Sequence, residues 1–295
     1  MTDSSTRPRR FQQVDVFTAV PYLGNPIAVV LDGEGLSDEQ MQQFARWTNL
    51  SETTFVLPPT DGQSDYRLRI FTPGAELPFA GHPTLGSAHA WLAAGGQARE
   101  PGVLRQQCGV GVVTLGQQAE GNWAFAAPPL RAEPVERELL AQVERALGIT
   151  HMRVSAAEWL DNGPRWLALL LDSPETVHAL APDHAALKRL GVKVGVAAVG
   201  EGGDARPDER AGDTRVLQVR AFAAAVGVEE DPVTGSLNAS LAQWLMGKGL
   251  LPARYQAFQG RALGRDGRVQ LARDAQGQVW VGGQCVGCIA GEVRL

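Results

Sequence analysis

The chain has 295 residues, of which 44% are hydrophobic and 20% charged, a composition typical of a globular protein with about two domains. Its 27 Lys and Arg residues against 32 Asp and Glu residues give a net charge of −5, and no segment gathers about five or six basic residues, so we expect no nucleic-acid partner. The longest apolar runs are far below the roughly 18 residues that span a bilayer, and the N-terminus lacks a signal-peptide pattern, so we expect no membrane partner and a cytoplasmic location.

In the first half, strand patterns alternate with two helical segments. One helix is expected from Ser37, which a Gln follows three residues later as in a capping box, to about Asn49. A second helix is opened by Gly81-His82-Pro83-Thr84 and runs through 85–94 to a pair of glycines. Strands are expected at 11–17, 26–31, 53–57, 66–71, 110–115 and 123–126.

The second half begins after Ala127-Pro128-Pro129, which interrupts the pattern. We therefore assign residues 1–127 and 128–295 to two domains, and the last strand could cross over to the first of them. The elements expected after the boundary are a helix at 135–147, strands at 166–171 and 192–199, a polar and mobile loop at 201–213, a strand at 214–222 and a helix at 237–246.

Three cysteines exclude a disulfide framework, and their odd number suits a reducing compartment. Cys285 and Cys288 form a Cys-x-x-Cys motif, which could be a redox pair or half of a zinc site. Their surroundings favour a strand, in which positions i and i+3 point to opposite faces, and Cys108 is the one further cysteine. We predict no metal site and leave the role of the pair open.

The two halves share a six-residue pattern. His82-Pro-Thr-Leu-Gly-Ser and Asp231-Pro-Val-Thr-Gly-Ser lie 149 residues apart, each after a strand and before a helix that contains Trp. We infer a duplicated strand-turn-helix unit in which His82 and Asp231 occupy equivalent places beside free backbone N–H groups. The repeat could also be purely architectural, with proline at the first helical position and glycine for close packing.

Two such helix starts facing one cleft would attract a carboxylate, because the unpaired amides and the helix dipoles both favour negative charge. The candidates for contacting the substrate are, in the two turns, Gly81, Thr84, Thr234 and Gly235. Asn25 could line the same cleft, although an Asn-Pro dipeptide is equally typical of an ordinary turn.

Several segments of the chain resemble the phenazine-biosynthesis PhzF-like isomerase family. They are GNPIAVV at 24–30, NLSET at 49–53, PFAGHPT at 78–84, NGPRW at 162–166, EDPVTGS at 230–236 and GEV at 291–293. The resemblance implies a diaminopimelate-epimerase-like α+β fold of two similar, pseudo-symmetric domains, each a curled antiparallel or mixed sheet, or a barrel, around a central helix. It also implies an active site in the cleft between them and a homodimer without a metal or organic cofactor.

In that family the glutamate of the Ser-Glu-Thr motif is the acid/base, and the family's catalytic residues fall here on Glu52, His82, Asp231 and Ser236. Its best-studied member isomerises trans-2,3-dihydro-3-hydroxyanthranilate by moving a proton between ring carbons. Each residue also has a plain structural interpretation: Glu52 as a solvent-exposed carboxylate, His82 as a turn histidine, Asp231 as a helix cap and Ser236 as a packing residue.

The sequence therefore predicts a cofactor-independent isomerase of a small carboxylated substrate, with Glu52 taking a proton from one carbon and returning it to another. Related racemases use two thiols, whereas His82-Pro83 and Asp231-Pro232 stand at these helix starts, which disfavours two-thiol chemistry. The alternative is a binding or interaction protein that keeps the cleft without turnover. The identity of the substrate and its pathway stay open.

Overall fold

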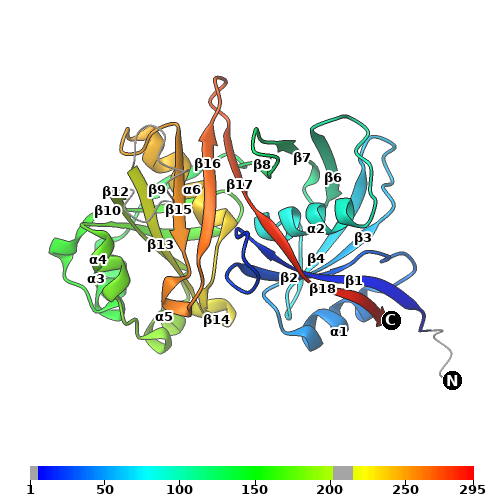
Figure 1. Cartoon of the computed structure of the whole chain (residues 1–295). Coiled ribbons are helices and arrows are strands. Elements are labelled where there is room, and N and C mark those ends of the chain that lie inside the picture. The colour runs from blue at the N-terminus through cyan, green and yellow to red at the C-terminus, as the bar shows by residue number, and fades with distance from the viewer. Residues whose placement is uncertain (1–5, 202–214) are drawn as a thin grey trace. The chain divides into compact units, whose positions relative to one another are not determined.

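Paired strands run through most of the structure, a computed structural model that describes residues 6–201 and 215–295 (Figure 1). They form two compact units: unit 1 comprises Met1–Ala126 and Gly282–Leu295, and unit 2 comprises Ala127–Val281. The first boundary differs by one residue from the expected one, and the last segment groups with unit 1 because β18 (Cys285–Arg294) pairs with β1 (Pro8–Val16). The mobile loop expected at 201–213 lies, apart from Glu201, outside the described residues.

Unit 1 contains, besides β1 and β18, the elements β2 (Asn25–Val30), α1 (Asp38–Thr48), β3 (Thr53–Leu57), β4 (Tyr66–Phe71), β5 (Glu76–Leu77), α2 (Gly81–Ala93), β6 (Val103–Cys108), β7 (Gly111–Gln117) and β8 (Trp123–Ala126). The strands follow the order β18, β1, β2, β3, β4, β6, β7 and β8. Two of these pairs, β2 with β3 and β4 with β6, are parallel, because a helix lies between their strands in the chain.

Unit 2 contains β9 (Arg131–Pro134), α3 (Arg137–Leu147), η1 (His151–Arg153), β10 (Val154–Asp161), β11 (Arg165–Leu171), α4 (Pro174–Ala179), α5 (His184–Leu190), β12 (Val194–Glu201), β13 (Arg215–Ala223), η3 (Ala224–Val226), β14 (Val228–Asp231), α6 (Gly235–Gly247), β15 (Arg254–Gln259), η4 (Arg261–Leu263), β16 (Gly267–Arg273) and the start of β17 (Val279–Gly283). The strands from β9 to β16 pair in the order β9, β10, β11, β12, β13, β15 and β16.

The two units repeat one topology. Both orders have antiparallel, antiparallel, parallel, antiparallel, parallel and antiparallel neighbours in succession. The register agrees as well. Tyr66 pairs with Gln106 in unit 1, and the residues 153 positions after each of them, Val219 and Gln259, pair in unit 2. The predicted duplication and the predicted α+β class are therefore both present in the structure.

In each unit the sheet curls around one central helix. Helix α2 contacts strands from both ends of its sheet, including β1, β3 and β8. The close approach needs glycine: a Cβ atom on Gly86 of α2 would lie 2.4 Å from Cγ2 of Ile27 in β2. In unit 2 a Cβ atom on Gly195 of β12 would lie 2.4 Å from Cδ1 of Leu237 in α6. Both central helices are buried along most of their length, as expected for helices that are apolar on all sides.

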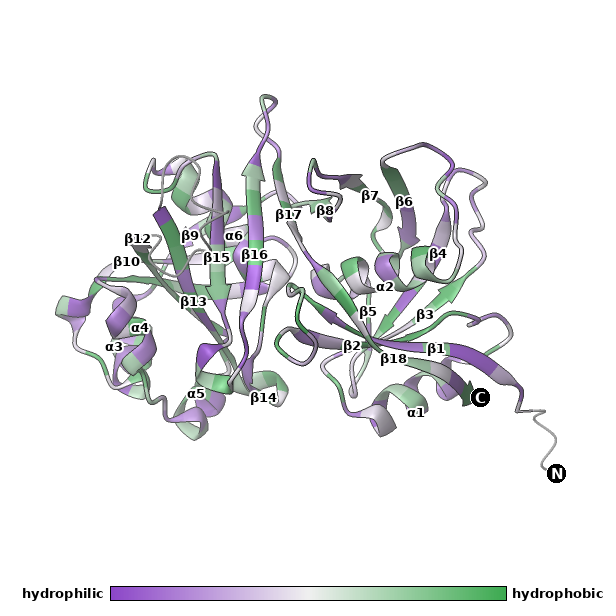
Figure 2. Ribbon diagram, in the orientation of Figure 1, coloured by the Kyte–Doolittle hydropathy of each residue, from purple (hydrophilic) through white to green (hydrophobic). Residues whose placement is uncertain are grey.

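Further helices cover the outer faces of the sheets. In unit 1, Met41 and Phe44 of α1 pack on Phe55 and Phe71. In unit 2, α3, α4 and α5 cover one face of β11 to β13 while α6 covers the other, so these strands are buried on both faces. This explains their nearly continuous apolar sequences, and hydrophobic residues predominate along β13 in Figure 2.

Several predicted elements are confirmed, and others were missed. Ser37 caps α1 in a capping box, with Asn49 in the left-handed conformation at its end, and β3, β4 and β8 have the expected bounds. The strands that the sequence did not predict include β6 and β15, in which buried glutamines interrupt the apolar alternation. The short helices α4 and α5 were also missed.

The cysteines are free thiols in the described residues, and Cys288 lies where the pairing of β18 with β1 shifts register. Burial raises the pKa of the Cys285 thiol to about 12. Among residues 6–201 and 215–295 no group of His, Cys, Asp and Glu side chains has a geometry suited to a metal ion.

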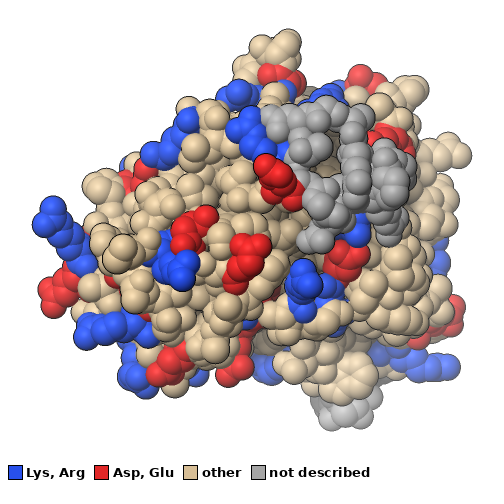
Figure 3. Space-filling view, turned by 60° about the vertical axis from the view of Figure 1, so that its left-hand side comes forward, with Lys and Arg blue, Asp and Glu red and all other residues tan. Residues whose placement is uncertain are grey.

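No helix of the described residues combines the length and the apolarity needed to cross a membrane. Figure 3 shows basic and acidic residues interspersed over the visible face, so the described side chains there form no single-sign patch.

Candidate functional site

In unit 1 the structure brings Glu52 and His82 together. Glu52 directly precedes β3, and His82 is the second residue of α2. Nε2 of His82 lies 3.3 Å from Oε2 of Glu52, and the two side chains are 6% and 15% exposed. Glu52 is therefore not the solvent-exposed carboxylate of the plain structural interpretation.

Burial governs the state of His82. It lowers the pKa of the imidazole to about 3, so the side chain is neutral near pH 7 and its contact with Glu52 is not an ion pair. The Nε2 atom is fully buried, yet it makes no well-aligned hydrogen bond within the described residues. Such orphaned polar atoms are costly and rare in folded proteins, and a functional site is one explanation for them.

Threonine and serine side chains hold this part of unit 1. The hydroxyls of Thr54 in β3 and Ser87 in α2 are 2.8 Å apart in the core, and those of Thr48 and Thr53 are also 2.8 Å apart. The first pair ties α2 to the strand that follows Glu52. Sequence reasoning gave Ser87 no role, and the structure gives it this one.

The other predicted residues of unit 1 lie at the starts of β2 and α2. Asn25 is the buried first residue of β2, and Gly81 is the buried first residue of α2. The Thr84 hydroxyl donates to the Ala80 carbonyl at 2.9 Å and accepts from Nε2 of Gln106 at 3.0 Å. That hydroxyl is engaged within unit 1, which leaves the backbone of this turn as the part suited to a ligand.

In unit 2 the predicted equivalence of Asp231 with His82 is wrong. Helix α6 begins at Gly235 with Thr234 as its cap, whereas Asp231 ends β14 four residues before Gly235. Because α2 begins at Gly81, the two helix starts are 154 residues apart rather than 149. The structural equivalent of His82 is therefore Ser236 and not Asp231, so Asp231 is neither the cap of this helix nor the partner of His82 in the repeat.

The error arose from a dipeptide that occurs at two different places. Gly86-Ser87 lies inside α2, whereas Gly235-Ser236 opens α6. Aligning the two Gly-Ser pairs therefore shifted the repeat by five residues.

A glutamine that sequence reasoning missed organises the turn before α6. Gln259, at the end of β15, donates from Nε2 to the Asp231 carbonyl at 3.0 Å and to the Thr234 hydroxyl at 2.9 Å. Its Oε1 accepts from the Thr234 amide at 3.0 Å and from Nδ2 of Asn238 at 2.9 Å. Because the Thr234 oxygen accepts from Gln259, its own proton goes to Oδ2 of Asp231 at 2.6 Å.

A sequence signal for Gln259 exists in retrospect. Gln106 in β6 holds the same place in unit 1, where it binds Thr84, the fourth residue of α2. Gln259 likewise binds Asn238, the fourth residue of α6. A glutamine in the strand after each central helix is thus part of the duplication.

Two residues of the 162–166 segment hold Ser236. Trp166 donates from its indole Nε1 to Oγ of Ser236 at 3.2 Å, and Asn162 donates from Nδ2 to the Ser236 carbonyl at 3.0 Å. In unit 2 the structure thus supports Asp231 and Ser236 with separate sets of hydrogen bonds.

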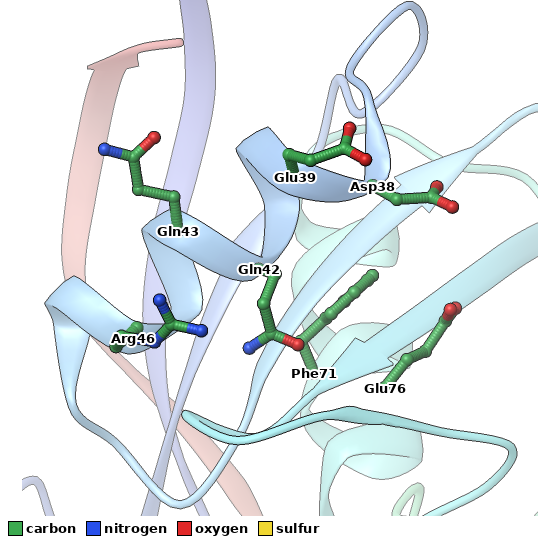
Figure 4. Close-up of a pocket in the computed structure, with 7 residues that line it drawn as sticks. All are labelled: Asp38, Glu39, Gln42, Gln43, Arg46, Phe71 and Glu76. Carbon is green, nitrogen blue, oxygen red and sulfur yellow. The ribbon is translucent and has the colours of Figure 1, made fainter.

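Two pockets in the described residues fall elsewhere. A cavity of about 430 Å³ in unit 1 contains none of the predicted site residues and is lined by Asp38, Glu39, Gln42, Gln43, Arg46, Phe71 and Glu76 (Figure 4). Arg69 already binds the carboxylates of Asp38 and Glu76 there. A cavity of about 360 Å³ in unit 2 includes Gln259 in its lining but none of the predicted residues.

Several residues of the family-like segments, among them His82 and Asn162, are thus buried polar residues. The comparison with known proteins supports the family resemblance. The sequence model for phenazine biosynthesis-like proteins (PhzC-PhzF) matches residues 14–291. The chain belongs to this family. The predicted resemblance is confirmed over nearly the whole chain.

Curated relatives of the PhzF family cover the chain almost end to end. Trans-2,3-dihydro-3-hydroxyanthranilate isomerase of Pseudomonas aeruginosa is 37% identical over 281 residues, 91% of this chain and 92% of its own. Antisense-enhancing sequence 1 of Schizosaccharomyces pombe is 36% identical over 298 residues, 96% of this chain and 97% of its own. Several relatives are named isomerases, which confirms the expectation that this PhzF-family chain is an isomerase.

Solved structures agree with the fold. The crystal structure of a PhzF-family protein from Enterococcus faecalis is 29% identical, covers 98% of this chain and 100% of its own, and superposes with a TM-score of 0.78. The predicted diaminopimelate-epimerase-like fold class is confirmed.

Proposed function

We propose that this chain is a cofactor-independent isomerase that moves a proton between two carbons of a small carboxylated substrate, with Glu52 as the single acid/base. The observation that carries the proposal is the buried contact of 3.3 Å between Glu52 and the neutral His82. A carboxylate at a largely buried position, next to an uncharged donor, is the arrangement that general acid/base catalysis on a C–H bond uses.

The reaction balances without an oxidant or reductant. Glu52 takes a proton as a C–H bond breaks, the electron pair spreads into the adjoining unsaturated system, and the protonated Glu52 delivers the proton to a second carbon. Because His82 is neutral near pH 7, it carries no positive charge that would lower the basicity of Glu52. Its Nε2 atom can instead share a hydrogen bond with Glu52 or with a polar group of the substrate.

The remaining roles in the proposal belong to groups that bind the substrate. The first-turn amides at Gly81 in α2 and at Gly235 in α6 each suit a carboxylate, because unpaired amides at helix starts bind anions. The amides of Thr84 and Thr234 already donate, to the Ala80 carbonyl and to Oε1 of Gln259. Asn25 in unit 1, and Asp231 and Ser236 in unit 2, are the further candidates for contacting polar groups of the substrate, as the family resemblance implies. We also propose a homodimer, as the family resemblance implies.

The substrate of the P. aeruginosa relative supplies the first probe. Wild type is given trans-2,3-dihydro-3-hydroxyanthranilate in D₂O, and NMR follows both turnover and deuterium entering at carbon. We expect Glu52→Gln to lower kcat/KM by at least about 100-fold, the typical worth of a general acid/base. The matched control is Glu76→Gln, which removes another carboxylate of unit 1.

The outcomes separate the proposal from its alternative. Activity of Glu52→Gln within a few-fold of wild type would show that another group moves the proton. Binding of small carboxylates by wild type with neither turnover nor deuterium exchange would favour a protein of this fold that binds its ligand without catalysis.

A further inference from the structure

The 162–166 segment has no part in the proposed chemistry, yet it holds one of the proposed site residues. We propose that Trp166 and Asn162 are positioning residues that fix Ser236 as a hydrogen-bond donor to an anionic or carbonyl oxygen of the substrate. The inference rests on the proposed function, because it assigns to Ser236 its share in binding the substrate.

The direction of the hydrogen bond to Trp166 decides the role of Ser236. An indole N–H can only donate, so Oγ of Ser236 must be the acceptor at 3.2 Å. The hydroxyl proton then points away from Trp166. Within the described residues this hydroxyl accepts from Trp166 and donates no hydrogen bond, which leaves its proton available to a ligand oxygen.

The backbone of Ser236 is held at the same time. Nδ2 of Asn162 donates to the Ser236 carbonyl at 3.0 Å, and Asn162 is only 7% exposed. The helix start and the hydroxyl are therefore fixed from the same side of unit 2. A hydroxyl whose oxygen and backbone are both anchored loses little further freedom when a ligand binds.

One hairpin carries both donors. Asn162 lies in the turn between β10 and β11, and Trp166 pairs with Leu160 near the end of β10. Gly163, with φ of 119°, takes a conformation that suits glycine, and its amide donates to Oδ1 of Asp161 at 2.9 Å. The Asn-Gly-Pro-Arg-Trp sequence thus presents two side-chain donors to one residue.

The indole ring is itself held in place. Trp166 is 3% exposed, and Nζ of Lys193 lies 4.9 Å from the centre of its ring. The Leu167 amide donates to the Lys193 carbonyl at 2.9 Å, which ties the two segments together beside the ring. The Nε1 donor therefore has a fixed direction before a substrate arrives.

The duplication supports a role for this position in the chemistry. Ser236 and His82 are the second residues of α6 and α2. The Ser236 hydroxyl donates no hydrogen bond within unit 2, and Nε2 of His82 makes no well-aligned hydrogen bond within unit 1. The two equivalent positions carry different side chains, so packing of the central helix does not dictate them.

The chain offers a matched control. Trp244 in α6 is 5% exposed, and its indole Nε1 has no hydrogen-bond partner within the described residues. Trp166→Phe and Trp244→Phe therefore make the same change to a buried ring, but only the first removes a donor to Ser236. Ser240→Ala, one turn further along α6, is the corresponding control for Ser236→Ala.

The first experiment is a double-mutant cycle on turnover of trans-2,3-dihydro-3-hydroxyanthranilate. We expect Trp166→Phe and Ser236→Ala each to lower kcat/KM about five- to tenfold, the usual worth of one hydrogen bond, and the double variant to lose no more than Ser236→Ala alone. Trp244→Phe and Ser240→Ala should stay within about twofold of wild type. Additive losses in the double variant, or equal losses from the two Trp variants, would overturn the proposal.

A second measurement does not depend on catalysis. In Glu52→Gln protein, titration with 3-hydroxyanthranilate should give affinities that Trp166→Phe and Ser236→Ala weaken by the same factor. The NMR signal of the Trp166 indole N–H should move on Ser236→Ala and not on Ser240→Ala. If Glu52→Gln stays active while the affinity and NMR results are as expected, Glu52 is not the acid/base, but Trp166 still positions Ser236. If the indole signal does not move or the affinity does not change, Trp166 does not position Ser236 for the substrate.

Discussion

Replacing Thr234 with valine tests how strongly the turn before α6 holds Asp231. Valine keeps the shape of threonine but removes a hydroxyl that accepts from Gln259 at 2.9 Å and donates to Oδ2 of Asp231 at 2.6 Å. Loss of the hydrogen bond to the carboxylate costs about 1.5–3 kcal/mol. The unsatisfied N–H of the buried Gln259 adds about 1 kcal/mol. We expect the free energy of unfolding to fall by about 2.5–4 kcal/mol.

The assay is equilibrium unfolding in urea, followed by circular dichroism. Thr234→Ser keeps the hydroxyl and should lose less than about 1 kcal/mol. Thr84→Val makes the same change in unit 1. The Thr84 hydroxyl also accepts from a glutamine, Gln106, but it donates to a backbone carbonyl and not to a carboxylate. The free energy of unfolding of this variant should therefore fall by about 1–2 kcal/mol. If Thr234→Ser loses as much as Thr234→Val, or if the two valine variants lose the same amount, the hydrogen-bond chain to Asp231 is not what stabilises the turn.

Two further predictions concern α2. Burial lowers the pKa of His82 from 6.5 to about 3, so between these pH values the unfolded chain binds more protons than the folded chain. The stability that neutral His82 contributes is therefore complete above pH 6.5. It falls by up to about 1.4 kcal/mol per pH unit as the pH drops toward 3. Unfolding of wild type and His82→Asn at several pH values measures this, and an imidazole NMR titration centred between pH 5 and 8 would contradict it. Gly86→Ala should lower the free energy of unfolding by about 1–3 kcal/mol, because its Cβ would lie 2.4 Å from Ile27. Gly247→Ala in α6 should leave the free energy of unfolding unchanged, because its Cβ would meet no atom within 4 Å. Equal changes in the two variants, measured by calorimetry, would refute the tight packing of α2 on β2.

Local signals in the sequence predicted the elements whose chemistry is complete within a few residues. Ser37 with its following Gln gave the start of α1, and apolar or β-branched runs gave β3 and β4. Strands β6 and β15 were missed because Gln106 and Gln259 are polar yet buried, and their burial depends on partners in the central helices. A pattern of apolar residues cannot contain that information.

The candidate site shows the same division. The sequence identified Glu52 and His82 as candidates through a family motif, and the structure brings their side chains to 3.3 Å. It made Asp231 the equivalent of His82 beside the start of α6, because an Asp-Pro dipeptide has the side chain and the ring that a helix start favours. The actual start depends on Gln259, whose Oε1 accepts the amide of Thr234, a contact between residues 25 positions apart.

The duplication separates what the fold requires from what the chemistry requires. At the fourth position of the central helices, Thr84 and Asn238 differ in type but do the same work, since each binds back to the cap carbonyl and to a glutamine of the next strand. At the second position, His82 and Ser236 differ in type and have no such shared partner. A fold that needed only a capped helix would place similar demands on both copies of that position. The two fourth residues make equivalent hydrogen bonds, whereas the two second residues do not. We infer that the fold requires the hydrogen bonds of the fourth residue, and that the second residue of each helix serves the chemistry of the site.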